Sequence, residues 1–286
     1  MAGTLTVPAG PGPFPVVLGV EGSGPSTRSA WGDWPDRLAA AGLATLAWDK
    51  PGCGASEGDW RDQTLDDRAT EVLAAAAAVR DHPAVAGRPV AALGGSQGGW
   101  VAPLAASRSD GLAAVVAVSG PGVTVAVQER YRIAHQLADG GLPPDEVAEA
   151  VAVYDARVAA LVRGDPPAAV LAAEADVRDR AWWPALGDET AEELAFLAGI
   201  LAHDPVPVLE RVRCPLLAVW GGRDLLVPVV ASLAAFDDAL RRGGNDRATL
   251  VVLPTADHGL RVHPGDGWGA AAASLITTWL AESLGD

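Results

Sequence analysis

The stretch that most constrains how this chain can fold is Gly94 to Gly98, with the sequence GGSQG. An apolar run at 89–93 precedes it and predicts a buried strand, and residues 99–107 after it predict a helix. The stretch matches the pattern G-x-S-x-G, which places a serine at a sharp turn between a strand and a helix. Small neighbours are needed there because the strand and the helix approach closely. We expect the Ser96 hydroxyl to stand above the sheet edge, with the backbone N–H of Gln97 beside it.

The rest of the chain alternates between apolar runs and helical segments. The runs that predict strands lie at 13–22, 43–50, 89–93, 111–119, 214–220 and 248–253. Strands that are buried on both faces appear in a sequence as continuous apolar runs, and their alternation with helices predicts a mostly parallel, doubly wound α/β sheet with helices on both faces. Ligands bind such sheets at the carboxyl ends of the strands. Ser96 and the glycine-rich segment 21–25 both lie at such ends.

The alternation stops after Gly122. From about 123 to 209 the sequence is helical and has no strand-like run, and proline pairs at 143–144 and 166–167 divide it. We expect an inserted helical cap at 123–209, with the core formed by 1–122 and 210–286. We expect an apolar substrate pocket under this cap. The candidate lining residues are Trp182, Trp183 and Trp100, although the adjacent pair could instead be buried inside the cap.

Two further strand ends carry an acid and a base. Asp224 follows the run at 214–220, and His258 follows the run at 248–253. A serine hydroxyl is a poor nucleophile until a histidine takes its proton, and the histidine needs a carboxylate to fix its tautomer. We therefore predict a catalytic triad of Ser96, Asp224 and His258. Asp257 is adjacent to the histidine, but neighbouring loop side chains usually point apart, so Asp224 is the better acid.

Segment 21–25 has backbone amides that could serve the same site. Its simplest interpretation is a turn that ends a strand. The alternative is half of an oxyanion hole, because hydrolases with this serine turn take one N–H donor from the loop after this strand. We favour the second interpretation because the segment is rich in glycine. The predicted donors are the N–H of Ser23, with Gly22 as the alternative, and the N–H of Gln97.

The composition excludes several classes of protein. The 286 residues carry a net charge of −15, which argues against nucleic-acid binding and against an anionic membrane surface. No apolar run reaches the length of a membrane-spanning helix, and the first residues lack a signal-peptide pattern. Cys53 and Cys214, the two cysteines, make neither a metal-binding spacing nor a disulfide framework. We expect a cytoplasmic protein that binds no metal, nucleic acid or membrane. Its oligomeric state stays open.

These stretches together resemble the α/β-hydrolase superfamily, and within it bacterial serine esterases and acyl-peptidase-like hydrolases with a helical cap. The matching segments cover nearly the whole chain outside the insertion; they are 22–25, 49–56, 94–100, 119–122, 221–224 and 257–259. The resemblance implies hydrolysis of a small-molecule acyl substrate through an acyl-enzyme, with no metal or organic cofactor. A carboxylic ester is the leading substrate class, as for a carboxylesterase, and a thioester, lactone or small amide needs the same machinery.

The chain departs from its relatives at two positions near the site. Gly95 and Glu21 stand where many relatives have histidine, before the serine and before the oxyanion glycine. A carboxylate aimed at an oxyanion would oppose catalysis, so we expect Glu21 to turn away toward Arg28. The same site could also serve an acyltransferase or a cyclase of a biosynthetic pathway. A ligand-binding protein with a decayed site is a third possibility, against which the intact Ser, Asp and His argue.

Overall fold

A computed structural model describes residues 1–187, 190–262 and 269–285. Within them, seven strands form one sheet in the order β1-β3-β2-β4-β5-β6-β7. All neighbours are parallel except β1, which pairs antiparallel with β3. The strands are β1 (Gly3–Thr6), β2 (Val16–Val20), β3 (Ala44–Trp48), β4 (Val90–Gly95), β5 (Ala114–Val118), β6 (Leu216–Gly221) and β7 (Ala248–Leu253). The predicted α/β fold with a mostly parallel sheet is confirmed.

The register of the central strands brings their carboxyl ends to one edge. Val20 of β2 pairs with Gly94 of β4, and the next residue, Gly95, pairs with Val118 of β5. Gly221 of β6 pairs with Leu253 of β7. Segments that leave these strands therefore start side by side, although they are far apart in the sequence.

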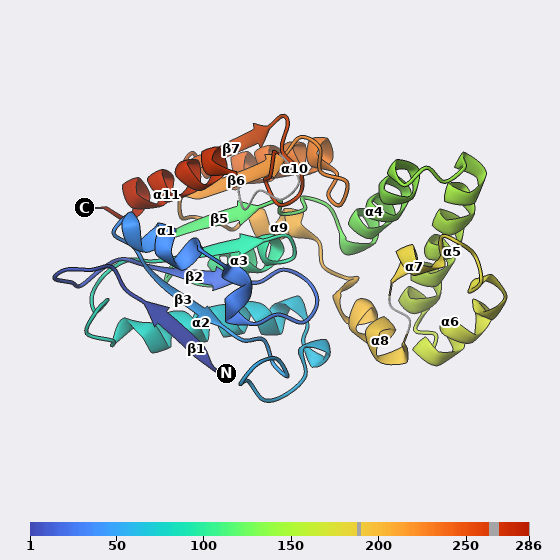
Figure 1. The fold of residues 1–286 in the computed structure, drawn as a ribbon, viewed down its shortest axis with the longest axis horizontal. Helices are drawn as coiled ribbons and strands as arrows, with labels where there is room; N and C mark the ends of the chain where they lie inside the picture. Colours follow the sequence, from blue (N-terminus) through green and yellow to red (C-terminus); the bar gives the residue numbers. More distant parts are fainter. Residues whose placement is uncertain (188–189, 263–268, 286) are drawn as a thin grey trace.

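Helices cover both faces of the sheet (Figure 1). One face packs against α1 (Trp34–Ala40) and α11 (Ala270–Leu284), and the other against α2 (Leu65–Arg80), α3 (Gly98–Ala106) and α10 (Val229–Arg242). Successive residues of a strand point to opposite faces. In β4, Ala91 and Leu93 accordingly join the first cluster, while Val90 and Ala92 join the second. Apolar residues at every position of β4 are needed because both of its faces are covered.

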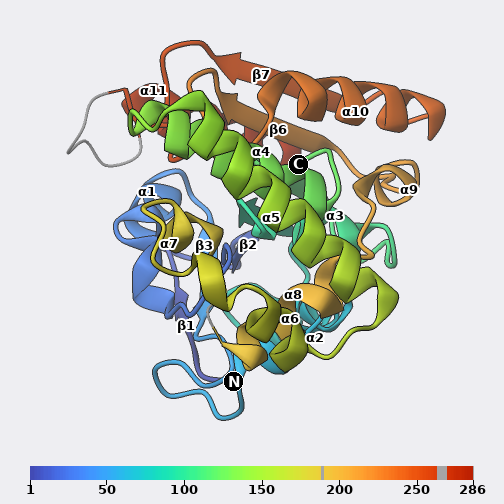
Figure 2. The same cartoon turned by 90° about the vertical axis from the view of Figure 1, so that its right-hand side faces the viewer.

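Most of the helical stretch between β5 and β6 lies to one side of the sheet (Figures 1 and 2), although Leu161, Leu194 and Leu197 belong to the same apolar cluster as the sheet. Its helices are α4 (Val125–Asp139), α5 (Pro144–Arg163), α6 (Pro167–Ala173), α7 (Trp183–Leu186), α8 (Ala191–Ile200) and α9 (Pro205–Leu209). The stretch has its own apolar cluster, which includes Ile133 and Tyr154. Helix α9, by contrast, packs against α3 and α10 of the core. The exact division of the chain at 122 and 209 stays a prediction.

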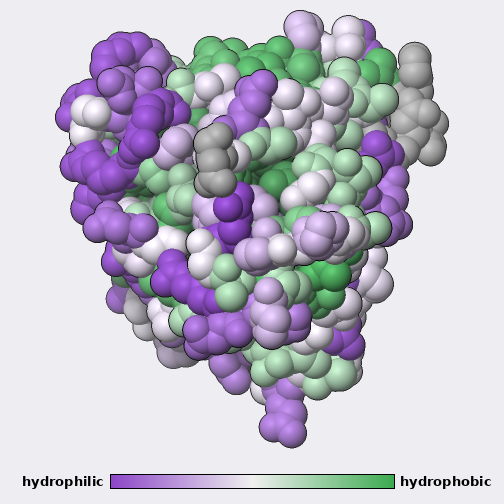
Figure 3. Space-filling model, turned by 90° about the vertical axis from the view of Figure 1, so that its left-hand side faces the viewer, coloured by the Kyte–Doolittle hydropathy of each residue, from purple (hydrophilic) through white to green (hydrophobic). Residues whose placement is uncertain are grey.

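Among the residues that the structure describes, the remaining elements are three short 3-10 helices: η1 (Arg28–Trp31), η2 (Trp60–Asp62) and η3 (Ala175–Val177). On the side opposite the inserted helices, hydrophilic and apolar residues are interspersed (Figure 3). None of the helices in the described part of the chain combines the length and apolar character needed to cross a bilayer.

Candidate active site

Ser96 directly follows β4 and has a left-handed backbone conformation, with φ of 53°. Few non-glycine residues adopt this conformation, and it is held here by the Ser96 N–H, which donates to the Val118 carbonyl at 2.8 Å. The flanking glycines are required by contact. A Cβ at Gly94 would lie 2.0 Å from the Gly98 carbonyl oxygen, and one at Gly98 would lie 2.3 Å from the Val20 carbonyl oxygen. Only glycine lets α3 begin this close to β2 and β4.

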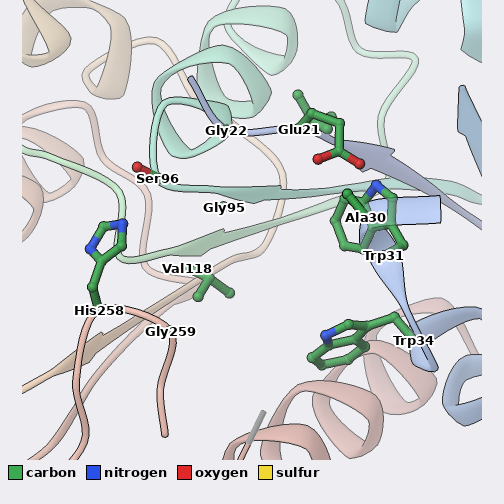
Figure 4. A pocket seen from close by; sticks show the side chains of 11 residues that line it. Glu21, Gly22, Ala30, Trp31, Trp34, Gly95, Ser96, Val118, His258 and Gly259 are labelled. Atoms are coloured by element: carbon green, nitrogen blue, oxygen red, sulfur yellow. The ribbon is translucent and has the colours of Figure 1, made fainter. Parts of the chain in front are cut away.

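The predicted acid and base lie in direct contact. The Nδ1 atom of His258 is 2.7 Å from Oδ2 of Asp224, whose residue is 3% exposed. The other carboxylate oxygen accepts the N–H groups of Leu226 and Val227, at 2.7 and 2.9 Å. With Nδ1 occupied by the acid, Nε2 of the imidazole is left for the serine. The ring is turned toward the Ser96 hydroxyl (Figure 4).

Two neighbours of His258 have different surroundings. Asp257 is directed outward, where it pairs with Arg261 at 3.1 Å and is accessible to solvent. Ser119, at the end of β5, donates its hydroxyl to the His258 carbonyl at 2.8 Å and has a φ of 48°. A strained serine therefore holds the loop that carries the base. Ser119 lies in the matching segment 119–122, but its contact with His258 was not predicted from the sequence.

The predicted oxyanion donors belong to two segments beside Ser96: Gln97 follows it in the chain, and Ser23 lines a cavity together with both. A Cβ at Gly22 would lie 3.6 Å from the Ser96 Cβ, so the segment after β2 passes directly against the serine. The backbone N–H groups of Gly22, Ser23 and Gln97 donate no hydrogen bond to any described residue. Free amides beside a nucleophile are what an oxyanion hole requires.

Glu21 does not interact with Arg28, and that expectation is wrong. Its carboxylate accepts the Ser26 hydroxyl at 2.9 Å, while Arg28 lies 3.6 Å from Asp49 and also gives its N–H to that residue. The side chain of Glu21 is nevertheless directed away from Ser96, beside Trp31 (Figure 4). Burial raises the pKa of its carboxyl group above the ordinary value, although the Ser26 hydroxyl and the nearby Lys50 and Arg68 act in the opposite direction.

Two cavities in the described part of the chain are lined by Ser96. The first, of about 190 Å³, extends toward the first helices of the chain, and the second, of about 270 Å³, lies under the inserted helices. Besides Ser96, the first is lined by residues that include His258, Gly259, Val118, Glu21, Trp31 and Trp34. The second is lined by residues that include Ser23, Gln97, Trp60, Trp100, Phe196 and Leu197. The nucleophile candidate lies where a substrate could extend in two directions.

Of the three candidate pocket tryptophans, Trp100 alone lines a cavity that reaches Ser96 in the described structure. Trp182 is 0% exposed and donates its indole N–H to Glu149 at 3.2 Å, and Trp183 packs in the same inner cluster of the insertion. The prediction that one of this pair lines the pocket is corrected by this placement. Trp182 precedes and Trp183 begins α7, a helix of four residues that packs against α4 and α5.

Two buried cations beside the site were also missed. Lys50 follows β3 and Arg68 lies on α2, and both donate to the carbonyls of segment 21–24. Arg68 had a detectable signal, because it lies among Leu65, Ala69 and Val72 on the apolar face of its helix. Within residues 1–187, 190–262 and 269–285, no cluster of three His, Cys, Asp or Glu side chains could hold a metal ion.

Comparisons with known proteins agree with this architecture. A sequence model of the alpha/beta hydrolase family matches residues 16–271. No curated protein matches the chain. Among solved structures, DcsB in complex with its substrate analogue is 16% identical to this chain, with a TM-score of 0.68. The alignment covers 99% of this chain and 94% of the DcsB chain. A monoacylglycerol lipase of Paleococcus ferrophilus is 20% identical with a TM-score of 0.61, with coverages of 99% and 98%.

The 2,6-dihydroxy-pseudo-oxynicotine hydrolase is a further structural neighbour, 20% identical with a TM-score of 0.62. The alignment takes in 99% of this chain but spans only 64% of the hydrolase chain. At such identities these similarities show a shared fold, and the chemistry has to be argued from the site.

Proposed function

The chain belongs to the alpha/beta hydrolase family, and we propose that it is a serine hydrolase that cleaves a carboxylic ester through an acyl-enzyme. The observation that carries the proposal is the 2.7 Å contact between His258 and the buried Asp224, with the imidazole turned toward Ser96. A histidine oriented in this way can take the serine proton. A thioester, lactone or small amide would react by the same steps.

The reaction begins when Nε2 of His258 accepts the Ser96 proton and Oγ attacks the substrate carbonyl carbon. The carbonyl oxygen becomes an oxyanion, which accepts hydrogen bonds from the N–H of Gln97 and from that of Ser23 or Gly22. The intermediate collapses and breaks the bond to the leaving group, which takes the proton from His258. A water molecule then attacks the acyl-enzyme, with His258 again as the base, and this step releases the acid and restores the serine.

The two cavities suggest how the substrate is divided. The leaving group must lie within reach of His258, because this residue protonates it. His258 lines the cavity of about 190 Å³ with Trp31 and Trp34, so we assign the leaving group to that cavity. The acyl group then occupies the cavity of about 270 Å³, where Trp60, Trp100 and Phe196 give it apolar walls. Two charged residues of α4, Arg132 and Glu129, also line this cavity. They pair with each other at 2.7 Å, so neither charge needs a partner on the substrate.

Acyl transfer, or cyclisation in a biosynthetic pathway, would use the same residues with an acceptor other than water. The side chain of His258 is 21% exposed, which supports access of water to the base and favours hydrolysis. The two reactions differ in turnover. A hydrolase releases product continuously in buffer, whereas a transferase without its acceptor stops after about one equivalent.

The proposal is tested with a series of nitrophenyl esters of increasing acyl length. We expect turnover of at least the short esters, and a loss of kcat on the order of 10⁶ in Ser96→Ala, because the members of a triad act as a unit. Circular dichroism should show that this variant is folded. Near-native turnover by folded Ser96→Ala would refute the proposal.

A further inference from the structure

The carbonyl oxygens of the segment after β2 are held by two buried cations. The Lys50 ammonium donates to the carbonyls of Gly22 and Gly24, at 2.5 and 2.7 Å. The Arg68 guanidinium donates to the Glu21 carbonyl at 2.6 Å and contacts the Gly22 carbonyl at 3.4 Å. Lys50 is 2% exposed and Arg68 5% exposed. Three carbonyls of four consecutive residues are thus held on one side.

This arrangement sets the direction of the amides. In a trans peptide unit, the C=O of one residue and the N–H of the next point in opposite directions. Arg68 on the Glu21 carbonyl therefore turns the Gly22 N–H away from itself, and Lys50 on the Gly22 carbonyl does the same for the Ser23 N–H. These two amides are the candidate oxyanion donors, and the segment that carries them lies against Ser96.

Arg68 also reaches the other half of the oxyanion hole. Its guanidinium donates to the side-chain carbonyl of Gln97 at 2.6 Å, and the backbone N–H of Gln97 is the remaining predicted donor. One side chain from α2 therefore links the segment after β2 to the serine turn. Arg68 contacts both halves of the hole, whereas Lys50 contacts the segment after β2.

Burying two cations opposes folding unless they are well compensated, and replacing buried charges by apolar residues often raises stability. The compensation here is supplied largely by the backbone carbonyls beside Ser96. We propose that Lys50 and Arg68 are positioning residues for the hydrolysis, which aim the N–H groups of Ser23 and Gly22 at the oxyanion and add positive potential there. This inference rests on the proposed function of Ser96.

The charge of Lys50 should influence how activity depends on pH. Burial, together with the nearby Arg68, lowers the pKa of Lys50 to about 7. The other titratable groups that face it are Glu21 at the end of β2, Cys53 in the segment after β3, and Glu71 on α2. Charged donors hold carbonyl oxygens more strongly than neutral ones. Activity should therefore decline as pH rises through about 7, whereas the need for a deprotonated base, the role proposed for His258, makes activity rise with pH.

The experiment measures two rates across the pH range: labelling of Ser96 by a fluorophosphonate, and ester turnover. It compares wild type with Lys50→Arg, Lys50→Met and Arg28→Met. Lys50→Arg keeps the positive charge at all pH values, so the alkaline decline should disappear. Lys50→Met should lose about 10²-fold in kcat with little change in KM, comparable to the loss of an oxyanion donor, and retain only the rising limb. Arg28 pairs with Asp49 and holds no carbonyl of segment 21–24, so Arg28→Met should behave as wild type.

Thermal unfolding of each variant identifies any that fail to fold. The pH profile of either Lys50 variant, if it is folded, is sufficient to test whether Lys50 is a positioning residue. An alkaline decline that persists unchanged in a folded Lys50 variant, or a wild-type kcat in Lys50→Met, would overturn the positioning role alone. Wild type that is not labelled at Ser96 would instead refute the proposed function, and the positioning role with it.

Discussion

Oδ2 of Asp224 lies 2.7 Å from Nδ1 of His258, while Oδ1 of the same carboxylate accepts two backbone N–H groups. Both oxygens are therefore used, and the carboxylate has a single orientation. Asp257, the next residue to the histidine, is instead exposed and pairs with Arg261. The structure separates the two candidate acids into one that contacts the imidazole and one that is accessible to solvent.

This separation predicts different effects of two matched substitutions. Asp224→Asn should lower kcat/KM roughly 10⁴-fold, because an amide no longer fixes the required tautomer of His258. Asp257→Asn removes an exposed ion pair, worth at most about 1 kcal/mol, and should change kcat/KM only slightly. Steady-state kinetics with one ester checks both. A severe loss at Asp257 with a mild one at Asp224 would assign the acid to Asp257.

The cavity under the inserted helices predicts a change in acyl-length preference. Phe196 lines this cavity and packs edge-on against Trp60, with ring centroids 5.0 Å apart. Phe196→Ala enlarges the cavity, so the preferred acyl chain should become longer. Each added methylene that is buried should be worth about 0.8 kcal/mol, or roughly fourfold in kcat/KM. A series of esters measures the shift.

Trp182→Ala is the control for that prediction. Trp182 is buried inside the insertion, so its removal should cost roughly 3–5 kcal/mol of unfolding free energy and leave the acyl preference unchanged. A change of preference in Trp182→Ala, with none in Phe196→Ala, would contradict the assignment of the acyl pocket.

We predict that the burial of His203 makes the folded protein less stable in acid. It packs edge-on against Trp100, and burial lowers its pKa from 6.5 to about 4. The unfolded chain therefore binds a proton at higher pH than the folded chain, so stability is retained above about pH 6.5 and lost as pH falls toward 4. At pH 4.5 the loss from this residue should be roughly 2 kcal/mol.

Urea unfolding at pH 7.5 and pH 4.5 measures this effect. His203→Gln should reduce the difference between the two pH values by about that amount. An equal pH dependence in His203→Gln and wild type would show that the buried imidazole does not contribute.

The sequence was sufficient for the fold and for the neighbourhood of three key side chains. Ser96, Asp224 and His258 each follow a buried apolar run, and parallel strands end at a common edge, so their convergence follows from topology alone. The glycines at 94 and 98 could also be understood in advance, because a side chain at either would collide with a neighbouring carbonyl.

Side-chain partners could not be predicted to the same extent. Trp182 and Trp183 belong to a stretch too short for periodicity to reveal which face is buried. The contacts of Lys50 and Arg68 with segment 21–24 join residues 26 to 47 positions apart, and they depend on how β2, β3 and α2 pack. Glu21 was expected near Arg28, but Ser26 is the nearer donor and Arg28 is held by Asp49.

The central claim is that Ser96 is a nucleophile activated by His258, and covalent labelling with a fluorophosphonate tests it most directly. Intact-mass measurement and peptide mapping should show one adduct per wild-type chain, on Ser96, and no adduct on folded Ser96→Ala. An adduct on a different residue, or equal labelling of Ser96→Ala, would contradict the claim.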